Sequence, residues 1–376
     1  MGEERTETAG RLETAGRLDL EPRTPARVVV TGAAGMLGSY LVRRLLADGH
    51  DVHGVDLRPP EIDAHPALSY SQGDVRDGEL LARAVKGATA LIHCAAALPS
   101  YPSEVIRSVI VEGTESVLSA ARRAGVPRVV YISSTAVYGL PRVVPTPEDH
   151  PREPVDPYTS AKAAAEEVAE RYRAAGMCIP MLRPKTFVGP GRMGLFAMLF
   201  EWAEEGRNFP VLGSGDMRIQ MLGIDDLVDA VMTVLGAPDE VANDTYNIAA
   251  AEFGTLREDF QAVLDMAGHG KRVVSLPARP ALAALRLMEL TRLSPVYGRL
   301  LHKLLADSYV SIDKARERLG WQPRMSNRDA VLRTYAWWRE QRSAAAPAAG
   351  GRAVNSGRTS RDAWRQGALS FTKFFF

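Results

Sequence analysis

Residues 27–38 constrain the fold more than any other part of the chain. A run of β-branched residues leads into three glycines at intervals of three, Gly32, Gly35 and Gly38, and then into apolar residues at helical spacing. A strand, a glycine turn and a helix in this order form the site that holds the pyrophosphate of a dinucleotide. Gly32 permits the tight turn, Gly35 lets the main chain approach the phosphates, and Gly38 lets the helix lie close to the strand. The first turn of that helix offers N–H groups and the positive end of its dipole.

The choice of dinucleotide depends on the second predicted strand, residues 51–56. It ends in Asp56, about twenty residues after the glycines, as in dinucleotide-binding folds. A carboxylate at this place can accept hydrogen bonds from the ribose hydroxyls and repels a 2′-phosphate. The sequence therefore predicts NAD rather than NADP, although the nearby Arg58 would favour the opposite choice.

Strand and helix patterns alternate from Arg27 onward with short connections. The predicted strands after the first are residues 51–56, 68–72, 90–94, 128–133 and 178–183. The predicted helices are residues 36–48, 79–86, 103–124, 158–175, 195–205, 224–235, 256–267, 313–319 and 328–342. This alternation predicts an α/β fold, a Rossmann-type doubly wound parallel sheet with a smaller C-terminal α/β substrate-binding part.

The chain divides into four predicted segments. Residues 26–190 form the NAD-binding domain, and residues 191–342 are mainly substrate-binding, with some segments returning to the sheet. Residues 1–25 are polar and contain a duplicated six-residue sequence, while residues 343–376 are rich in small residues. Both ends are predicted to be disordered because they have little apolar surface to bury. A leucine-rich stretch, residues 281–305, could cover an apolar pocket.

Charge and composition exclude several classes of function. The chain of 376 residues carries 46 basic and 45 acidic side chains, a net charge of +1, and no basic run. This balance does not favour nucleic acid or an anionic membrane as a partner. No apolar stretch is long enough to span a bilayer, and the two cysteines, Cys94 and Cys178, do not have metal-ligand spacing. We expect a soluble, cytoplasmic protein without a metal site.

Three polar residues are candidates for catalysis. Tyr158 and Lys162 are four residues apart, on one face of a predicted helix. The ammonium group would stabilise the phenolate form of Tyr158, which would then act as a general base. Ser134 lies where the fifth strand ends, and its hydroxyl would bond the substrate oxygen. The alternative interpretations are a surface tyrosine beside a solvated lysine, and a serine that caps its own turn.

Several motifs occur together in a fixed order. They are Thr-Gly-x-x-Gly-x-x-Gly at 31–38, Gly-Asp-Val-Arg-Asp at 73–77, His-Cys-Ala-Ala at 93–96, Ser-Ser at 133–134 with Val-Tyr-Gly at 137–139, Tyr-x-x-x-Lys at 158–162, Arg-Pro at 183–184 with Gly-Pro-Gly at 189–191, and Leu-Gly-Trp-x-Pro at 319–323. Over residues 27–339 the chain resembles the extended short-chain dehydrogenases/reductases, the NAD-dependent epimerase/dehydratase group that includes UDP-glucose 4-epimerase.

The resemblance implies a role for each matching residue of the cofactor site. Met36 and Leu37 would present N–H groups to the pyrophosphate, and Asp74 and Val75 would flank the adenine. Ala95, in the motif after the fourth strand, would also contact the cofactor.

The resemblance likewise assigns the reacting groups. Tyr158 would be the acid/base and Ser134 its hydroxyl partner, while Lys162 would hold the nicotinamide ribose. Arg218 matches an arginine that binds substrate phosphate in sugar-nucleotide enzymes. Thr186 stands where UDP-glucose 4-epimerase has an asparagine that faces the diphosphate.

Two departures from the family pattern bear on the reaction. Dehydratases of the group follow the catalytic hydroxyl with Asp-Glu, whereas this chain has Thr135 and Ala136, so dehydration is not expected. The Asn-Val-x-Gly-Thr motif begins here with Ile110, which removes a polar residue near the site.

The expected function is a sugar-nucleotide epimerase of the 4-epimerase kind, with tightly held NAD. The alternative is an NAD-dependent dehydrogenase or reductase of a sterol-like or other apolar secondary alcohol. A third interpretation is a non-catalytic NAD-sensing or scaffold protein, and the intact set of Ser134, Tyr158 and Lys162 argues against it. The expected partner is a small molecule, with a homodimer as one possible assembly.

Overall fold

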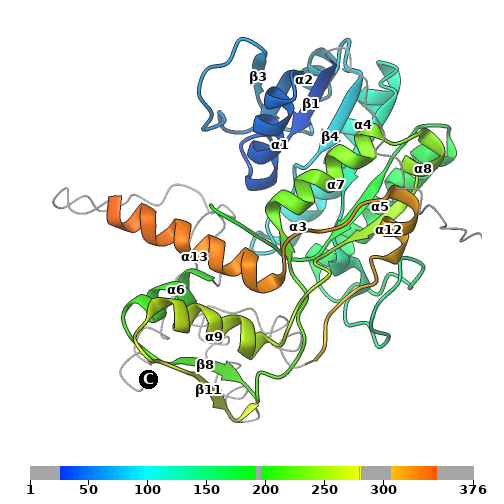
Figure 1. Cartoon of the computed structure of the whole chain (residues 1–376). Helices are drawn as coiled ribbons and strands as arrows, with labels where there is room; N and C mark the ends of the chain where they lie inside the picture. Colours follow the sequence, from blue (N-terminus) through cyan, green and yellow to red (C-terminus); the bar gives the residue numbers. More distant parts are fainter. Residues whose placement is uncertain (1–25, 192–195, 279, 281–305, 345–376) are drawn as a thin grey trace, which may run out of the picture.

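A seven-stranded parallel sheet forms the centre of the computed structural model, which describes residues 26–191, 196–278, 280 and 306–344 (Figure 1). The strands lie in the order β10-β6-β5-β4-β1-β2-β3. Their bounds are β1 Arg27–Thr31, β2 Asp51–Asp56, β3 Leu68–Gln72, β4 Ala90–His93, β5 Arg128–Ile132, β6 Met181–Pro184 and β10 Thr245–Ile248. All of these pairings are parallel, so the predicted doubly wound fold is confirmed.

Helices cover both faces of the sheet because each strand sends alternate side chains to opposite sides. In β1, Val28 and Val30 pack in the cluster that contains Leu41 of one covering helix, while Val29 packs in the cluster that contains Leu81. The first face carries α1 (Met36–Ala47) and α7 (Ile224–Gly236). The second face carries α2 (Gly78–Ala84), α4 (Gly113–Arg123) and α5 (Pro157–Ala174). Shorter helices are α3 (Ser103–Arg107), α8 (Asp239–Ala242) and α12 (Asp313–Leu319).

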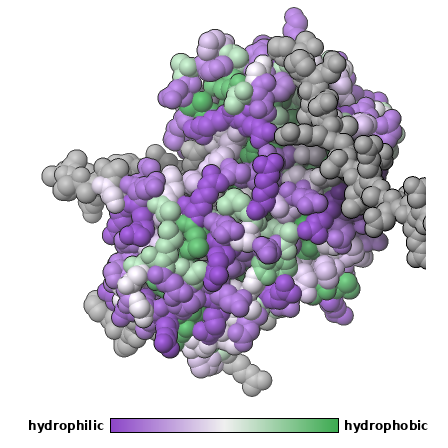
Figure 2. Space-filling view, viewed as in Figure 1, coloured by the Kyte–Doolittle hydropathy of each residue, from purple (hydrophilic) through white to green (hydrophobic). Residues whose placement is uncertain are grey.

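The C-terminal part has a core of its own, built from apolar faces of α6 (Phe196–Glu204), α9 (Leu256–Ala267) and α13 (Asn327–Ala344). Two short parallel pairs complete it: β8 (Phe209–Leu212) with β11 (Val273–Leu276), and β7 (Phe187–Val188) with β9 (Leu222–Gly223). In Figure 1 this part lies below the sheet. The face seen in Figure 2 is mostly hydrophilic with small apolar patches, as expected when the apolar faces of the helices are buried.

The structure differs from the predictions in several places. The short elements β7, β8, β9, β11 and α8 have no counterpart among the predicted strands and helices, and β6 begins at Met181 rather than at residue 178. Strand β10 was not predicted, since its four residues include a polar Asn247 and are too few to show a period. The predicted helix 103–124 contains a π-helical turn, Ser108–Glu112, between α3 and α4. Helix α13 continues through Ala344, two residues into the predicted tail, because alanine is a strong helix former. The predictions for residues 1–25, 281–305 and 345–376 lie outside the described residues.

The strand order places the predicted site residues at one edge of the sheet. The chain builds β2 and β3 on one side of β1 and then crosses to β4 on the other side. Ligands of such sheets bind at this crossing, beyond the carboxyl ends of the strands. Gly32 follows β1 and Ser134 follows β5, so both lie at that edge.

The glycine turn depends on a close approach between backbone segments. A Cβ atom on Gly38 would lie 2.0 Å from the carbonyl oxygen of Gly32, which is far below a van der Waals contact. Since the obstructing atom belongs to the main chain, no side-chain rotation can relieve the overlap.

We expect Gly38→Ala to lower the free energy of unfolding by about 1–3 kcal/mol, as overpacking does, and to weaken NAD binding. The measurement is urea denaturation together with calorimetric titration of NAD. Gly78→Ala is the matched control: it also lies in a helix, nothing lies within 4 Å of its added Cβ, and it should not lower stability. Equal stability of the two variants would show that the close approach is not needed.

Candidate active site

The turn after β1 forms a cradle made of main chain. Gly32 has a φ of +71°, and its N–H group donates to the carbonyl oxygen of Val55 over 2.8 Å. A Cβ at Gly32 would lie 2.7 Å from the backbone nitrogen of Ala95, which follows β4. The turn and the end of β4 therefore approach as closely as glycine allows, and they bring the predicted residues Gly32 and Ala95 together.

The start of helix α1 offers main-chain hydrogen-bond donors to a diphosphate. Gly35 is its N-cap residue, so Met36 and Leu37 occupy the first turn, in which N–H groups have no intrahelical acceptor. The side chains of Met36 and Leu37 are buried in the core. Both residues would thus contact a phosphate through the main chain, assisted by the helix dipole.

Two acidic residues stand at the ends of β2 and β3, where the sequence predicts the adenosine of NAD: Asp56 is the last residue of β2 and Asp74 follows β3. The carboxylate of Asp56 accepts a hydrogen bond from Ala34 N–H at 3.0 Å, so it is tied to the glycine turn. Asp74 forms an ion pair with Arg76 at 2.6 Å, and this hydrogen bond holds the pKa of Asp74 below its ordinary value. The neighbouring Val75 is buried. The N–H groups at the start of α1 would suit the pyrophosphate of NAD, and the carboxylate of Asp56 would suit the hydroxyls of its ribose.

The start of helix α5 fixes the position of Tyr158. Asp156 is the N-cap residue, and its carboxylate accepts a hydrogen bond from Thr159 N–H at 2.8 Å. The hydroxyl of Thr159 accepts in return from Asp156 N–H at 3.0 Å, which completes a capping box. Pro157 is pre-organised for the first helical position. Tyr158 is therefore the second residue of a firmly capped helix, half-buried at the edge of the core.

Lys162 lies one turn further along α5 and is only 4% exposed. Its ammonium group donates to the carbonyl oxygen of Ile132, at the end of β5, over 2.9 Å. It also lies 5.3 Å from the ring centre of Tyr131. Burial lowers the pKa of Lys162 to about 8, against the opposing effect of the Glu166 carboxylate. The structure thus holds a buried cation next to the strand end that carries Ser134, which a solvated surface lysine would not do.

Ser134 caps the short 3-10 helix formed by Thr135–Tyr138. Its Oγ accepts a hydrogen bond from Ala136 N–H at 3.1 Å, so the turn-capping interpretation describes a real contact. A hydroxyl that accepts one hydrogen bond can still donate its hydrogen. The cap therefore fixes Oγ at the end of β5 and leaves its donor capacity for a substrate oxygen.

The predicted substrate residues Thr186 and Arg218 lie on connected segments. Thr186 follows β6, and its side chain is exposed. The ammonium of Lys185 donates to Ser308 Oγ at 2.8 Å, and Ser308 N–H donates to the carbonyl oxygen of Arg218 at 2.9 Å. Through these contacts the segment that carries Arg218 is attached to the end of β6, at the same edge as Ser134.

Sequence reasoning assigned no role to two buried polar groups below the site. His93 bonds Thr31 Oγ1 at 2.7 Å and Thr114 Oγ1 at 3.1 Å, and burial lowers its pKa to about 3, so it stays neutral. Glu166 forms an ion pair with Arg183 at 2.7 Å. The available signal for Glu166 was its place four residues after Lys162, on the same helical face.

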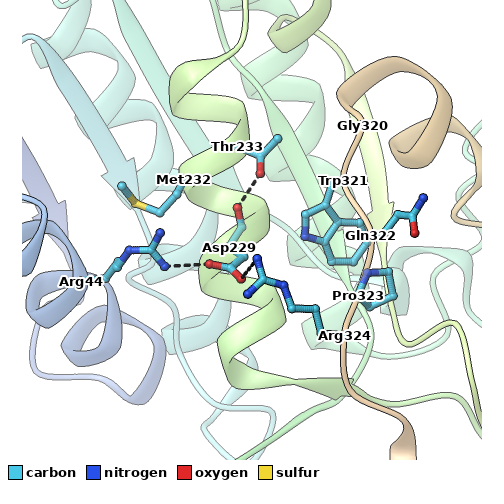
Figure 3. Close-up of a pocket in the computed structure, with 9 residues that line it drawn as sticks. All are labelled: Arg44, Asp229, Met232, Thr233, Gly320, Trp321, Gln322, Pro323 and Arg324. Carbon is cyan, nitrogen blue, oxygen red and sulfur yellow. Dashed lines mark hydrogen bonds and ion pairs between the residues drawn. The ribbon is translucent and has the colours of Figure 1, made fainter. Parts of the chain in front are cut away.

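A surface hollow of about 570 Å³ lies elsewhere, between α1, α7 and residues 320–324 (Figure 3). None of the predicted site residues lines it. Arg44 and Arg324 both direct their guanidinium groups at Asp229, at 2.7 and 3.6 Å. That carboxylate already pairs with both cations, so these ion pairs join α1, α7 and the C-terminal segment to one another. We therefore interpret the hollow as a structural contact region.

The described ranges hold neither a helix that could span a membrane nor a cluster of metal-binding side chains. No helix there is both long enough and apolar enough to cross a bilayer. No group of three or more His, Cys, Asp and Glu side chains in those ranges could hold a metal ion.

The chain is similar to known proteins in sequence and in structure. Residues 28–249 match the model of the NAD dependent epimerase/dehydratase family. The chain is 30% identical over 334 residues to a UDP-glucose 4-epimerase of Mycolicibacterium smegmatis, covering 84% of this chain and 99% of that one. It is 31% identical over 328 residues to a 3 beta-hydroxysteroid dehydrogenase/Delta 5-->4-isomerase of Mycobacterium tuberculosis, covering 81% and 88%. Among solved structures, MoeE5 in complex with UDP-glucose and NAD superposes with a TM-score of 0.68 at 26% identity, covering 84% and 99%.

We expect Tyr158→Phe to reduce turnover to near background while NAD still binds, because it removes the proton carrier and leaves the phosphate cradle intact. Steady-state kinetics and calorimetric titration of NAD measure the two effects. Tyr172→Phe is the matched control, since Tyr172 lies on the same helix and its hydroxyl bonds Glu115 at 2.6 Å, away from the sheet edge. Normal activity of Tyr158→Phe would remove Tyr158 from the mechanism.

Proposed function

The chain belongs to the NAD-dependent epimerase/dehydratase family, and from this premise we propose that it is a sugar-nucleotide epimerase. The proposed reaction is of the 4-epimerase kind: a ring hydroxyl is oxidised for a moment to a ketone and then reduced on its other face. The proton and the oxygen of that hydroxyl would be bound and transferred by Tyr158, Lys162 and Ser134. The diphosphate of the substrate would be bound by Arg218.

The observation that carries the proposal is the environment of Arg218. Its guanidinium lies over the rings of Phe253 and Tyr309, 4.6 and 5.3 Å from their centres. Toward the described residues its side chain makes one hydrogen bond, a long one of 3.4 Å to the carbonyl oxygen of Phe253, and the residue is exposed. A guanidinium held against two aromatic rings is fixed in place by contacts that do not consume its N–H donors, so it can offer them to an anion, and a diphosphate matches their geometry.

The three proposed catalytic side chains would have different tasks. Tyr158 would take the proton of the ring hydroxyl, and Ser134 would donate a hydrogen bond to the same oxygen. The ammonium of Lys162 would stabilise the phenolate of Tyr158 and hold the ribose. When bound, NAD supplies the capacity to accept and return a hydride. Tyr158 would give its proton back to the sugar oxygen in the second half of the reaction.

A second candidate function is supported by a separate observation. Large apolar side chains are exposed on the segments that follow β4 and β5, around the same edge of the sheet. They are Tyr101, Val105, Leu140, Val143 and Val155. Such a rim would suit a sterol-like or other apolar secondary alcohol, and the resemblance to a steroid dehydrogenase points the same way. On this interpretation the protein is a dehydrogenase, and Arg218 has no anion to bind.

We expect Arg218→Ala to raise the KM for a nucleotide sugar about tenfold or more, because a charge-assisted hydrogen bond contributes about 1.5–3 kcal/mol. NAD binding should not change, since Arg218 lies outside the cofactor cradle. The measurement is steady-state kinetics on the nucleotide sugar that stabilises the NAD-loaded protein most in a thermal screen of UDP-, GDP- and dTDP-sugars.

Two further variants make this test specific. Arg218→Lys should restore affinity only in part, because lysine lacks the planar fork. Arg207→Ala is the control: it removes a cation of the same part of the chain, one that pairs with Glu205 at 2.9 Å, and should leave KM unchanged. An unchanged KM in Arg218→Ala would favour the apolar-alcohol dehydrogenase.

A further inference from the structure

Glu166 is a carboxylate buried directly beneath the catalytic residues. It lies on α5, eight residues after Tyr158 and four after Lys162, and its side chain is 0% exposed. Residues four apart on a helix are neighbours on one face, so Lys162 stands between Tyr158 and Glu166.

Both oxygens of this carboxylate are fully used. Oε1 accepts hydrogen bonds from Ser133 Oγ and from Arg183 Nε, the latter at 2.9 Å. Oε2 accepts from Arg183 Nη2 at 2.7 Å and from Arg152 Nη1 at 3.3 Å. Ser133 directly precedes Ser134, and Arg183 lies in β6, so these bonds tie α5 to the ends of two strands.

Arg183 extends the network across the edge of the sheet. Its Nη1 donates to the hydroxyl of Tyr138 and to the carbonyl oxygen of Glu148, both at 2.8 Å. The hydroxyl of Tyr138 in turn donates to the side chain of Asn247, in β10, at 2.8 Å. The turn that begins at Ser134, the loop after it and the last strand of the sheet are thus joined to Glu166.

Three other titratable groups near Lys162, which are His93, Cys94 and Tyr131, carry no negative charge near neutral pH. Burial lowers the pKa of His93 to about 3 and raises that of Cys94 to about 12, and it also raises the pKa of Tyr131. Tyr158 lies on the preceding turn of α5, and its phenolate is the form that Lys162 would stabilise. Glu166 is therefore the carboxylate whose charge opposes the cost of burying Lys162 as a cation.

We propose that Glu166 is a positioning residue: it keeps Lys162 charged and locks α5 to the strand ends that present Ser134. The role concerns the shared Ser134, Tyr158 and Lys162 site, so it holds for an epimerase and for a dehydrogenase alike. Glu166 itself touches neither substrate nor cofactor in this account, and it acts through Lys162 and Ser133.

The experiment titrates Lys162 directly by NMR on the full-length chain with ¹³C-labelled lysine, with and without added NAD. The chain contains seven lysines, so the signals are few, and Lys162→Met identifies the one in question. We expect a wild-type midpoint near pH 8. In Glu166→Gln, which keeps an oxygen for Ser133 but loses the charge, the midpoint should fall by about one pH unit or more, a tenfold change in the acid constant.

Two variants keep the test decisive. Glu170→Gln is the control, because Glu170 lies one turn further on, is half-exposed and pairs with Arg152 at 2.8 Å; it should leave the midpoint unchanged. Arg152→Gln removes one cation from Glu166 while Arg183 still binds both oxygens, so the fold is retained and the Lys162 midpoint should rise. If Glu166→Gln does not fold, the direction of the Arg152→Gln shift decides. A wild-type midpoint in Glu166→Gln, or in Arg152→Gln where Glu166→Gln does not fold, would overturn the proposal.

Discussion

The buried ion pair between Glu166 and Arg183 is the interaction on which the geometry of the site depends. It joins α5, which carries Tyr158 and Lys162, to β6, and through Ser133 to the end of β5. Removing one partner of such a pair costs about 3–5 kcal/mol, because the other charge stays buried without compensation. Hydrogen bonds to Glu166 raise the pKa of Arg183 despite its burial, so Arg183 stays a cation. The edge of the sheet that carries the candidate site is thus held by electrostatics as well as by packing.

The two halves of the site are built on different physical principles. In the cofactor half, backbone segments lie in close contact. Gly32 and Gly38 stand where a Cβ atom would overlap the neighbouring backbone. The reactive half is a set of side chains on a capped helix, held over the strand ends by hydrogen bonds. The two halves meet at one edge because the carboxyl ends of parallel strands lie on the same side of the sheet. They meet beside β1 because the chain there changes the direction in which it adds strands.

Local sequence signals predicted the parts of this structure that depend on local chemistry. The glycine spacing gave the β1 turn, and the alternation of elements gave the doubly wound sheet. The capping residues Asp156 and Thr159 show why α5 begins beside Tyr158. The site residues proposed from the sequence gather at one edge, yet their functional roles stay predictions.

The features that sequence reasoning missed depend on contacts between distant segments. Strand β10 is four residues long and exists because it pairs with β6, more than sixty positions earlier in the chain. The partners of Glu166 are Ser133 just after β5, Arg152 in the loop before α5 and Arg183 in β6. Their spacing along the chain does not predict that they meet. The aromatic support of Arg218 likewise comes from Phe253 and Tyr309, which approach only in the folded chain.

The central claim is that oxidation and reduction both occur on one substrate while the same NAD stays bound. It is tested most directly by gel filtration of the NAD-loaded protein, followed by incubation with UDP-glucose or the nucleotide sugar that binds best, with absorbance recorded at 340 nm. The account predicts that NAD survives gel filtration at close to one per chain and that product forms without net NADH. Loss of NAD on the column, with NADH accumulating in step with substrate consumed once NAD is added back, would contradict it.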